Sequence, residues 1–358
     1  MNIGIACGGT GGHVYPGLAT GRVLQTRGHR VTLWFSPNNI GQLFIGQWDG
    51  PVVYVGAKGL SSRPNLEWIG GLKKQYSAYK VSLRLLKETS PDVLLAMGSY
   101  TSVAPALASW KLGVPIVLHE GNVIPGRAIS FLSYFAKSIG VAFEGASRYF
   151  PLKKINWTGF PMVHDFSLQF KDEYFPPEQF TLLVMGGSQG SSCLNEIVPE
   201  AVIRLYRSGY NLQVLHITGA QGESAVREKY EREGIKHMVF SFYREMGRLY
   251  NKANLAICRS GAATCMELSA SGVPAVVIPL PSSIRDHQKR NALELQMQGG
   301  ALMLPQEELT SENLSQLILN YMDFPEKLQF MGNAIKGVGC VDGAAKLADL
   351  VENSCARL

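Results

Sequence analysis

The chain lacks the features that define several large protein classes. Its 358 residues include only six cysteines, none in a C-x-x-C pair, which argues against a disulfide framework or a zinc site and favours reduced thiols. No apolar run reaches the roughly 18 to 20 residues of a membrane-spanning helix. The first residues show neither a basic segment nor a cleavage site, so no export signal is expected. These absences favour a cytoplasmic protein.

Charge and the common nucleotide fingerprints are also sparse. Charged residues make up 17% of the chain and leave a formal balance of +6, which suits an anionic partner such as a nucleoside diphosphate or an acidic membrane surface. No basic run with interleaved aromatics supports a nucleic-acid partner. Neither G-x-G-x-x-G nor G-x-x-x-x-G-K-[ST] occurs, so nicotinamide and P-loop binding lose their usual support.

One pattern is present twice. IGIACGGTGG at 3–12 and TLLVMGGSQG at 181–190 each join a continuous apolar run, typical of a buried parallel strand, to a Gly-rich loop. Each loop leads into a helix-like segment, at 16–26 and 192–205. Such a loop aims backbone N–H groups and the positive end of a helix at one point, where a phosphate can bind. The alternative for either loop alone is a tight turn that needs positive φ.

The remaining segments predict two doubly wound α/β domains. Strand-like and helix-like segments alternate, which is typical of a parallel sheet covered on both faces. The predicted strands are 3–7, 30–35, 52–55, 92–97, 115–119, 181–185, 213–218, 237–240, 255–258 and 275–278. We expect domains at 1–158 and 159–340, with a linker in the proline-rich stretch 151–177. A C-terminal helix within 341–358 is expected to pack back across the cleft on either domain.

The segment 68–88 admits two interpretations. It mixes apolar residues with five basic ones, Lys73, Lys74, Lys80, Arg84 and Lys87. This pattern fits a helix resting on an anionic membrane surface. It also fits a helix that covers the sheet and exposes a basic face to solvent.

The densest pattern of polar site residues lies in 254–291. After a strand ends at Cys258, Thr264-x-x-Glu267 matches a capping box, in which Glu267 would bond the start of its own helix. The alternative is that this carboxylate accepts both hydroxyls of a ribose. Further on, Asp286, His287, Gln288 and Asn291 follow a strand exit, where open α/β sheets bind polar ligands.

Five motifs together resemble one family. GGTGGHVYPG at 8–17, HEGNVIPG at 119–126, GGSQG at 186–190, RSGAATCMEL at 259–268 and DHQKRNA at 286–292 are similar to the MurG family, the N-acetylglucosaminyltransferases that convert lipid I to lipid II in peptidoglycan synthesis. The resemblance covers essentially the whole chain. It implies a GT-B fold, in which two Rossmann-like domains face a central cleft.

The resemblance also implies roles for particular residues. The N-terminal domain would bind the acceptor and associate with the membrane, while the C-terminal domain would bind UDP-GlcNAc. His13 matches the proposed base, Glu267 the ribose ligand, Ser188 a diphosphate ligand and Tyr243 a residue lining the uracil. The other implied donor contacts are Thr10, Gly11, Gly12 and Asn122 near the sugar and reaction centre, Ala262, Ala263 and Thr264 at the nucleotide, and Gln288 and Asn291 at the GlcNAc.

The chemistry agrees with these residue types. Inverting transfer needs a base for the acceptor hydroxyl, and the positive end of a helix would keep the His13 imidazole neutral. His119 and Glu120 are alternative bases or structural supports. No D-x-D motif lies in these loops, so helix N-termini would stabilise the leaving diphosphate, and neither a metal nor a cofactor is expected.

Two departures from the family pattern keep alternatives open. Val163 stands where the family has an arginine that helps to hold the diphosphate, with Arg259 and Lys289 as candidate substitutes, and Gly121 replaces a glutamine. The alternatives are a GT-B transferase with another lipid or natural-product acceptor, an inactive UDP-sugar-binding protein in a cell-wall assembly, and a UDP-sugar epimerase. The leading expectation is a peripheral enzyme on the cytoplasmic face of the inner membrane that meets lipid I there.

Overall fold

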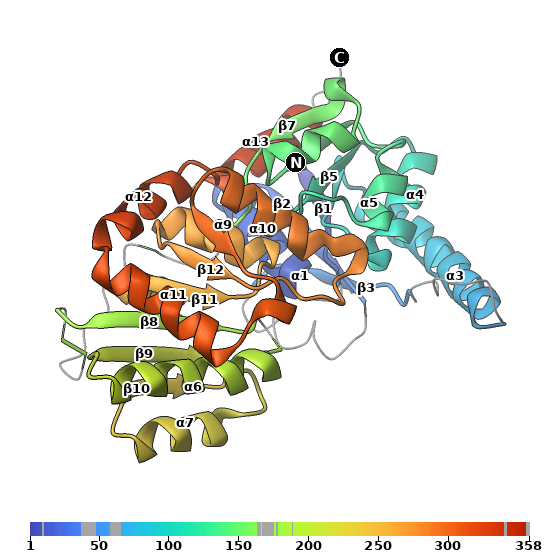
Figure 1. Cartoon of the computed structure of the whole chain (residues 1–358). Coiled ribbons are helices and arrows are strands. Elements are labelled where there is room, and N and C mark those ends of the chain that lie inside the picture. The colour runs from blue at the N-terminus through green and yellow to red at the C-terminus, as the bar shows by residue number, and fades with distance from the viewer. Residues whose placement is uncertain are drawn as a thin grey trace. The chain divides into compact units, whose positions relative to one another are not determined.

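The chain forms two compact units. The computed structural model describes residues 1–8, 11–36, 48–57, 66–162, 166, 175–176, 178–187, 189–339 and 342–355. Unit 1 consists of Met1–Val163 together with Cys340–Leu358, and unit 2 is His164–Gly339 (Figure 1). Among the predicted site residues, Thr10, Ser188 and the departure at Val163 lie outside the described residues.

Unit 1 contains a parallel sheet with strand order β3-β2-β1-β4-β5-β6-β7. Its strands are β1 (Asn2–Ala6), β2 (Arg30–Phe35), β3 (Val52–Tyr54), β4 (Val93–Ala96), β5 (Ile116–Glu120), β6 (Ser138–Val141) and β7 (Ile155–Trp157). Its helices are α1 (Gly11–Thr26), α3 (Leu66–Thr89), α4 (Val103–Lys111), α5 (Arg127–Leu132) and α13 (Gly343–Cys355). The central strands are apolar throughout because helices cover both of their faces.

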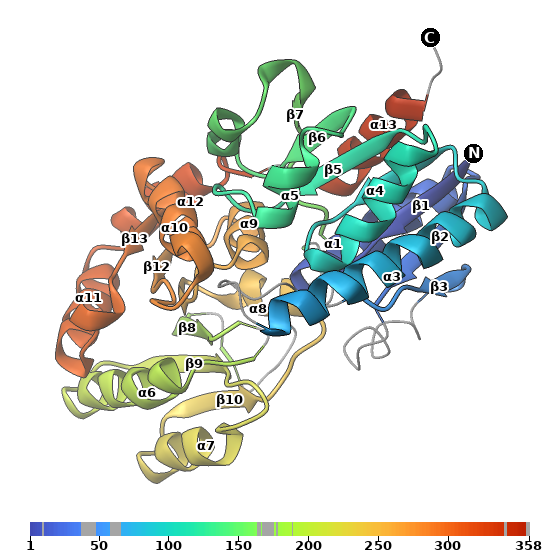
Figure 2. The ribbon, with the colours of Figure 1, turned by 90° about the vertical axis from the view of Figure 1, so that its right-hand side faces the viewer.

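Alternate residues of each strand enter different cores. Val93 and Leu95 of β4 pack with α1 and α13, whereas Leu94 and Ala96 pack with α3, α4 and α5. Figure 2 shows α13, in red, beside β5 although it comes from the other end of the chain. The C-terminal helix therefore completes the core of unit 1.

Unit 2 contains a second parallel sheet with order β10-β9-β8-β11-β12-β13. Its strands are β8 (Phe180–Met185), β9 (Leu212–Ile217), β10 (Lys236–Phe240), β11 (Leu255–Cys258), β12 (Ala275–Val277) and β13 (Ala301–Met303). Its helices are α6 (Ser192–Arg207), α7 (Glu223–Arg232), α8 (Met246–Lys252), α9 (Ala262–Ser271), α10 (His287–Met297), α11 (Ser311–Asp323) and α12 (Pro325–Ile335). One core cluster joins α6, α7 and α11 to the strands.

These sheets confirm the predicted fold class, with three local corrections. Helix α1 begins at Gly11 rather than at the predicted Pro16, which lies inside it. The predicted linker 151–177 contains β7, whose Ile155 pairs with Ile139 of β6. Helix α9 begins at Ala262 with Gly261 as its N-cap, so Thr264 and Glu267 lie within the helix and form no capping box. The short strand β7 lies at the edge of the sheet, where too few residues carry a readable alternation.

Candidate active site

Each sheet has one point at which the strand order reverses. It lies between β1 and β4 in unit 1 and between β8 and β11 in unit 2. The loops after two such neighbouring strands leave to opposite faces of the sheet and make room for a ligand at the carboxyl ends. Both predicted Gly-rich loops follow a strand at one of these points, β1 or β8.

His13 spans the reversal point of unit 1. It lies in the first turn of α1, after β1, and its Nδ1 is 2.8 Å from the carbonyl oxygen of Met97, which follows β4. A carbonyl oxygen only accepts hydrogen bonds, so Nδ1 carries the hydrogen. In the neutral ring the lone pair is then on Nε2, which is the atom able to take a proton.

Small residues surround this imidazole. A β-carbon at Gly8 would come within 2.8 Å of the His13 Cβ, and one at Gly98 within 3.3 Å of its Cε1. Gly98 has a φ of +94°, and Ser99 has φ +63° and ψ 163°, a conformation almost confined to glycine. The turn after β4 is therefore strained where it contacts the predicted base.

Glu120 organises the loop that carries Asn122. Its Oε1 accepts hydrogen bonds from the backbone N–H and the side-chain Nδ2 of Asn122, at 2.9 and 3.1 Å. Its Oε2 accepts from the N–H of Gly126 at 2.8 Å. Burial raises the pKa of this carboxyl, and the three donors oppose that change. Glu120 was a candidate for a catalytic base or for a structural support of the loop, and these hydrogen bonds favour the structural role.

His119 is also held in a structural setting. Its ring is buried, its Nε2 lies 3.1 Å from the carbonyl oxygen of Gly159, and its edge faces Phe160. Burial lowers the pKa of His119 to about 4. This position supports packing of the β5 end and not proton transfer to a substrate.

In unit 2, the Gly-rich loop packs backbone against backbone. Gly190 has a φ of +77°, and a β-carbon there would overlap the carbonyl oxygen of Thr218. The loop ends at Ser191, the N-cap of α6, whose Oγ accepts from the N–H of Leu194 at 3.4 Å. Asn195 of α6 donates to the Thr218 carbonyl at 3.0 Å and so ties the loop after β9 to this helix.

Arg259 spans the reversal point of unit 2. It follows β11, and its Nη2 donates to the Oγ of Ser191, after β8, at 2.9 Å and to Oε1 of Gln306 at 2.6 Å. Its Nη1 donates to the carbonyl oxygens of Ile278 and Pro279. This buried guanidinium therefore holds strand ends together, which leaves it poorly suited to replace the family arginine. Lys289, the other candidate substitute, is exposed on α10.

Glu267 lies in the second turn of α9 and is half-buried. Its Oε2 accepts a hydrogen bond from the hydroxyl of Tyr250 in α8 at 2.8 Å. Ala262, Ala263 and Thr264 form the first turn of the same helix, where N–H groups have no partner within the helix. A carboxylate and a positive helix end thus come from one element.

The turn before α9 is joined to α10. Ser260 donates through its Oγ to the carbonyl oxygen of Gln288 at 2.8 Å, and Asn291 donates to the Ser260 carbonyl at 3.1 Å. Gln288 is half-buried and accepts from the N–H of Leu280 through Oε1, whereas Asn291 is fully buried. The structure thus brings Gln288 and Asn291 next to the α9 turn.

Tyr243 follows β10, at the same edge of the sheet. Its ring is half-buried and lies 4.8 Å from that of Phe240. Burial, with a contribution from Glu245, raises the pKa of its hydroxyl. Its ring is therefore a neutral surface near the carboxyl ends of the strands.

Sequence reasoning missed the groups that orient these side chains. The carbonyl of Met97, the Ser191–Arg259 bond and the hydroxyl of Tyr250 all act across 17 to 84 residues of chain. No local motif marks them, since they become neighbours only when the strand order is known.

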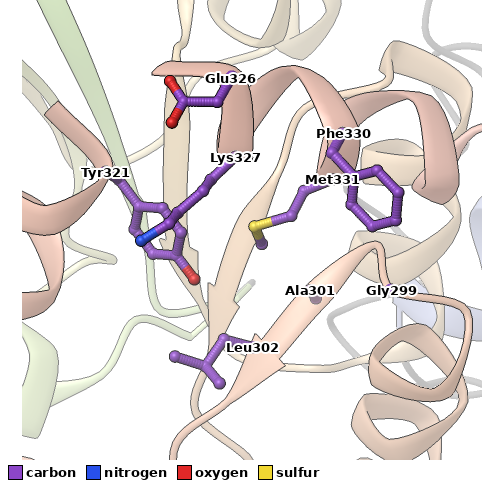
Figure 3. Close-up of a pocket in the computed structure, with 8 residues that line it drawn as sticks. All are labelled: Gly299, Ala301, Leu302, Tyr321, Glu326, Lys327, Phe330 and Met331. Carbon is purple, nitrogen blue, oxygen red and sulfur yellow. The ribbon is translucent and has the colours of Figure 1, made fainter. Parts of the chain in front are cut away.

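An apolar pocket of unit 2 lies apart from the predicted site residues. Figure 3 shows an apolar pocket of about 440 Å³ in unit 2, lined by residues of β13, α11 and α12 such as Leu302, Tyr321 and Phe330. It contains none of the predicted site residues. Within the ranges that the structure describes, no three His, Cys, Asp or Glu side chains gather as metal ligands, and no helix is long and apolar enough to cross a bilayer.

Comparison with known proteins agrees with this geometry. The glycosyltransferase family 28 N-terminal domain matches residues 3–141, and the C-terminal domain of that family matches residues 181–347. A Myxococcus xanthus protein named UDP-N-acetylglucosamine–N-acetylmuramyl-(pentapeptide) pyrophosphoryl-undecaprenol N-acetylglucosamine transferase is 32% identical, over 98% of this chain and 92% of the relative. A protein of the same name from Tolumonas auensis is 33% identical, over 99% and 98%.

A solved structure gives the same result. The crystal structure of Acinetobacter baumannii MurG matches with a TM-score of 0.81 and 28% identity, covering 98% of this chain and 99% of that one. The family resemblance drawn from the five motifs is confirmed. Matched at this identity over nearly its whole length, the chain belongs to the MurG family of N-acetylglucosamine transferases, within glycosyltransferase family 28.

Proposed function

We propose that this chain transfers N-acetylglucosamine from UDP-GlcNAc to the 4-hydroxyl of muramoyl-pentapeptide-diphospho-undecaprenol, or lipid I, and so forms lipid II. The relatives' names state this activity, and their similarity extends over both units. The observation in this chain that best supports it is the hydrogen bond from His13 to the Met97 carbonyl, which leaves the proton-accepting lone pair on Nε2.

In this tautomer His13 can act as the base of the transfer reaction. Nε2 of His13 takes the proton of the acceptor hydroxyl while its oxygen forms a bond to the anomeric carbon of GlcNAc. The bond from that carbon to the diphosphate oxygen breaks, and UDP leaves with the electron pair. Attack from the face opposite UDP inverts the anomeric centre. Helix N-termini stabilise the charge that develops on the diphosphate.

The donor is assigned to unit 2. Glu267 accepts hydrogen bonds from the ribose, the first turn of α9 and Ser188 bind the diphosphate, and Tyr243 lines the uracil. Gln288 and Asn291 are assigned to the GlcNAc, and Asn291 also holds the α9 turn through Ser260. From unit 1, Thr10, Gly11, Gly12 and Asn122 are assigned to the sugar and the reaction centre.

The acceptor and the membrane are assigned to the N-terminal domain, residues 1–158. Its helix α3 contacts α4, and exposed apolar side chains occur on both helices and near α5: Leu72, Tyr76, Trp110, Phe131 and Tyr134. Basic residues flank them on α3. This pattern supports peripheral attachment to the cytoplasmic face of the inner membrane, where lipid I and other cell-wall assembly proteins would be met.

The test compares His13→Ala with the unaltered protein on UDP-GlcNAc and a short-chain lipid I analogue. We expect the GlcNAc–MurNAc disaccharide from the unaltered protein and a loss of about 10²- to 10⁴-fold in kcat for the variant. His237→Ala is the matched control, since this half-buried histidine also has its Nδ1 on a carbonyl oxygen, that of Ile235.

Equal rates for His13→Ala would keep the reaction and remove His13 as its base. Absence of product from the unaltered protein, with UDP-GlcNAc still bound, would instead favour a transferase with another acceptor or a UDP-sugar-binding protein.

A further inference from the structure

Tyr250 is buried directly behind the predicted ribose ligand. Its side chain is 1% exposed, and its hydroxyl donates to Oε2 of Glu267 at 2.8 Å. The two residues come from α8 and α9, which precede and follow β11 in the chain and contact each other. The bond therefore links the carboxylate to a second helix.

This hydroxyl is a fixed donor. Burial, followed by the charge of Glu267, keeps the pKa of Tyr250 well above its usual value, so the proton stays on the phenol. A carboxylate has about four acceptor positions, so Glu267 can accept from Tyr250 and from other donors at the same time. Since the terminal torsion of a glutamate is soft, a hydrogen bond to one oxygen restricts the directions in which the other acceptor positions point.

We propose that Tyr250 is a positioning residue that orients the Glu267 carboxylate toward the two ribose hydroxyls of the donor, and thereby sets the preference for a ribonucleotide over a 2′-deoxyribonucleotide. This inference rests on the proposed function, in which Glu267 holds the ribose. A diol is recognised best when the carboxylate that accepts its two hydrogen bonds is already held in the binding orientation. Without the Tyr250 hydroxyl, the Glu267 side chain must become ordered when the ribose binds, and this ordering lowers the affinity for the ribonucleotide.

The test measures the affinities of UDP and 2′-deoxy-UDP by calorimetry for the unaltered protein and for Tyr250→Phe. We expect Tyr250→Phe to weaken UDP binding by about 5- to 30-fold, less than the full loss of one hydrogen bond to a charged group, because Tyr250 acts through Glu267 and does not itself contact the ligand. Binding of 2′-deoxy-UDP should change by less than about 3-fold. In kinetics, KM for UDP-GlcNAc should rise by the same factor with little change in kcat, as for a contact made equally in the ground and transition states.

Tyr230→Phe is the matched control. Tyr230 is also fully buried in unit 2, but its hydroxyl bonds His216 at 3.1 Å and not Glu267. Tyr230→Phe also removes a buried tyrosine hydroxyl from unit 2, but one that does not contact Glu267. The preference for UDP over 2′-deoxy-UDP should therefore stay unchanged. In a Glu267→Gln background, Tyr250→Phe should add less than about 2-fold.

The outcomes separate this inference from the function beneath it. No UDP binding by the unaltered protein would overturn both. A ribonucleotide preference that survives Tyr250→Phe, or that falls equally in Tyr230→Phe, would overturn only the role of Tyr250. Should Tyr250→Phe fail to fold, Glu267→Asp replaces it, because the side chain shorter by one methylene withdraws the carboxylate from the Tyr250 hydroxyl; a ribonucleotide preference unchanged in that variant would contradict the proposal.

Discussion

Buried histidines in this chain are held neutral by their neighbours. His216 is fully buried in β9, with its Nε2 at 3.1 Å from Oδ1 of Asn195 and its Nδ1 at 3.1 Å from the hydroxyl of Tyr230. The amide oxygen can only accept, so Nε2 carries the hydrogen and Nδ1 accepts from the tyrosine. Burial lowers the pKa of His216 to about 3, and that of His119 to about 4.

Acid should therefore destabilise the protein through these rings. The unfolded chain binds a proton at His216 below about pH 6.5, whereas the folded chain does not until about pH 3. Stability is thus complete above pH 6.5 and falls as the pH drops toward 3, by about 3 kcal/mol at pH 4.5 for this ring.

Urea unfolding at several pH values between 4.5 and 7.5 checks this expectation. His216→Gln should show a weaker decline of the unfolding free energy than the unaltered chain, whatever its stability at pH 7.5. His119→Gln should show a similar weakening. Parallel curves for all three proteins would contradict the argument.

The two faces of helix α3 have different surroundings. Ala78 and Leu86 pack into the core of unit 1, while Leu72 and Tyr76 are 41% and 60% exposed beside Lys73 and Lys74. The Nζ of Lys80 lies over the Tyr76 ring, 4.7 Å from its centroid. Of the two interpretations of this segment, the structure shows that it covers the sheet, and its outer face still carries the pattern of a membrane-contacting helix.

Sedimentation with lipid vesicles tests the outer face. The double variant Leu72→Ser with Tyr76→Ser should bind phosphatidylglycerol vesicles at least about 10-fold more weakly, because each apolar side chain contributes about 1.5 to 3 kcal/mol when buried. Phe330→Ser, at an equally exposed aromatic residue of unit 2, is the control. Unchanged binding of the double variant would remove α3 from the proposed membrane surface.

The chain consists of two units with separate cores, and the C-terminal helix α13 packs into the core of unit 1. Leu347, Ala348 and Val351 of α13 are fully buried among residues of β1, β2 and α1. At the surface, the Nη1 of Arg27 lies 2.7 Å from both Asp349 and Glu352. Unit 1 therefore depends on a helix that follows unit 2 in the chain.

Leu347→Ala should lower the unfolding free energy of unit 1 by about 2 to 5 kcal/mol, since it leaves a cavity in a closed core. All five tryptophans precede residue 163, so tryptophan fluorescence during urea unfolding reports on unit 1 alone. Leu72→Ala, the same change at an exposed leucine, should have little effect. Equal midpoints for the two variants would show that α13 is dispensable to this core.

The amino-acid sequence alone predicts two parallel α/β sheets and ten of their strands. Continuous apolar runs and Gly-rich loops are local patterns, and they place His13 and Glu267 in the segments after β1 and β11, although the predicted starts of both helices were wrong. The strands β6, β7 and β13 and the true starts of α1 and α9 escaped this reasoning, because strands of three or four residues and helices that begin at or after a glycine leave little local pattern.

How the site residues are held depends on contacts between segments that are distant in the sequence. The nitrogen of His13 that carries the hydrogen depends on Met97, which is 84 residues away, and the orientation of Glu267 depends on a neighbouring helix. The assignment of Arg259 and Glu120 to structural support likewise follows from partners that share no motif with them. Hydrogen bonds are directional and short, so they are determined by which strands become neighbours, and no local pattern of residues contains that information.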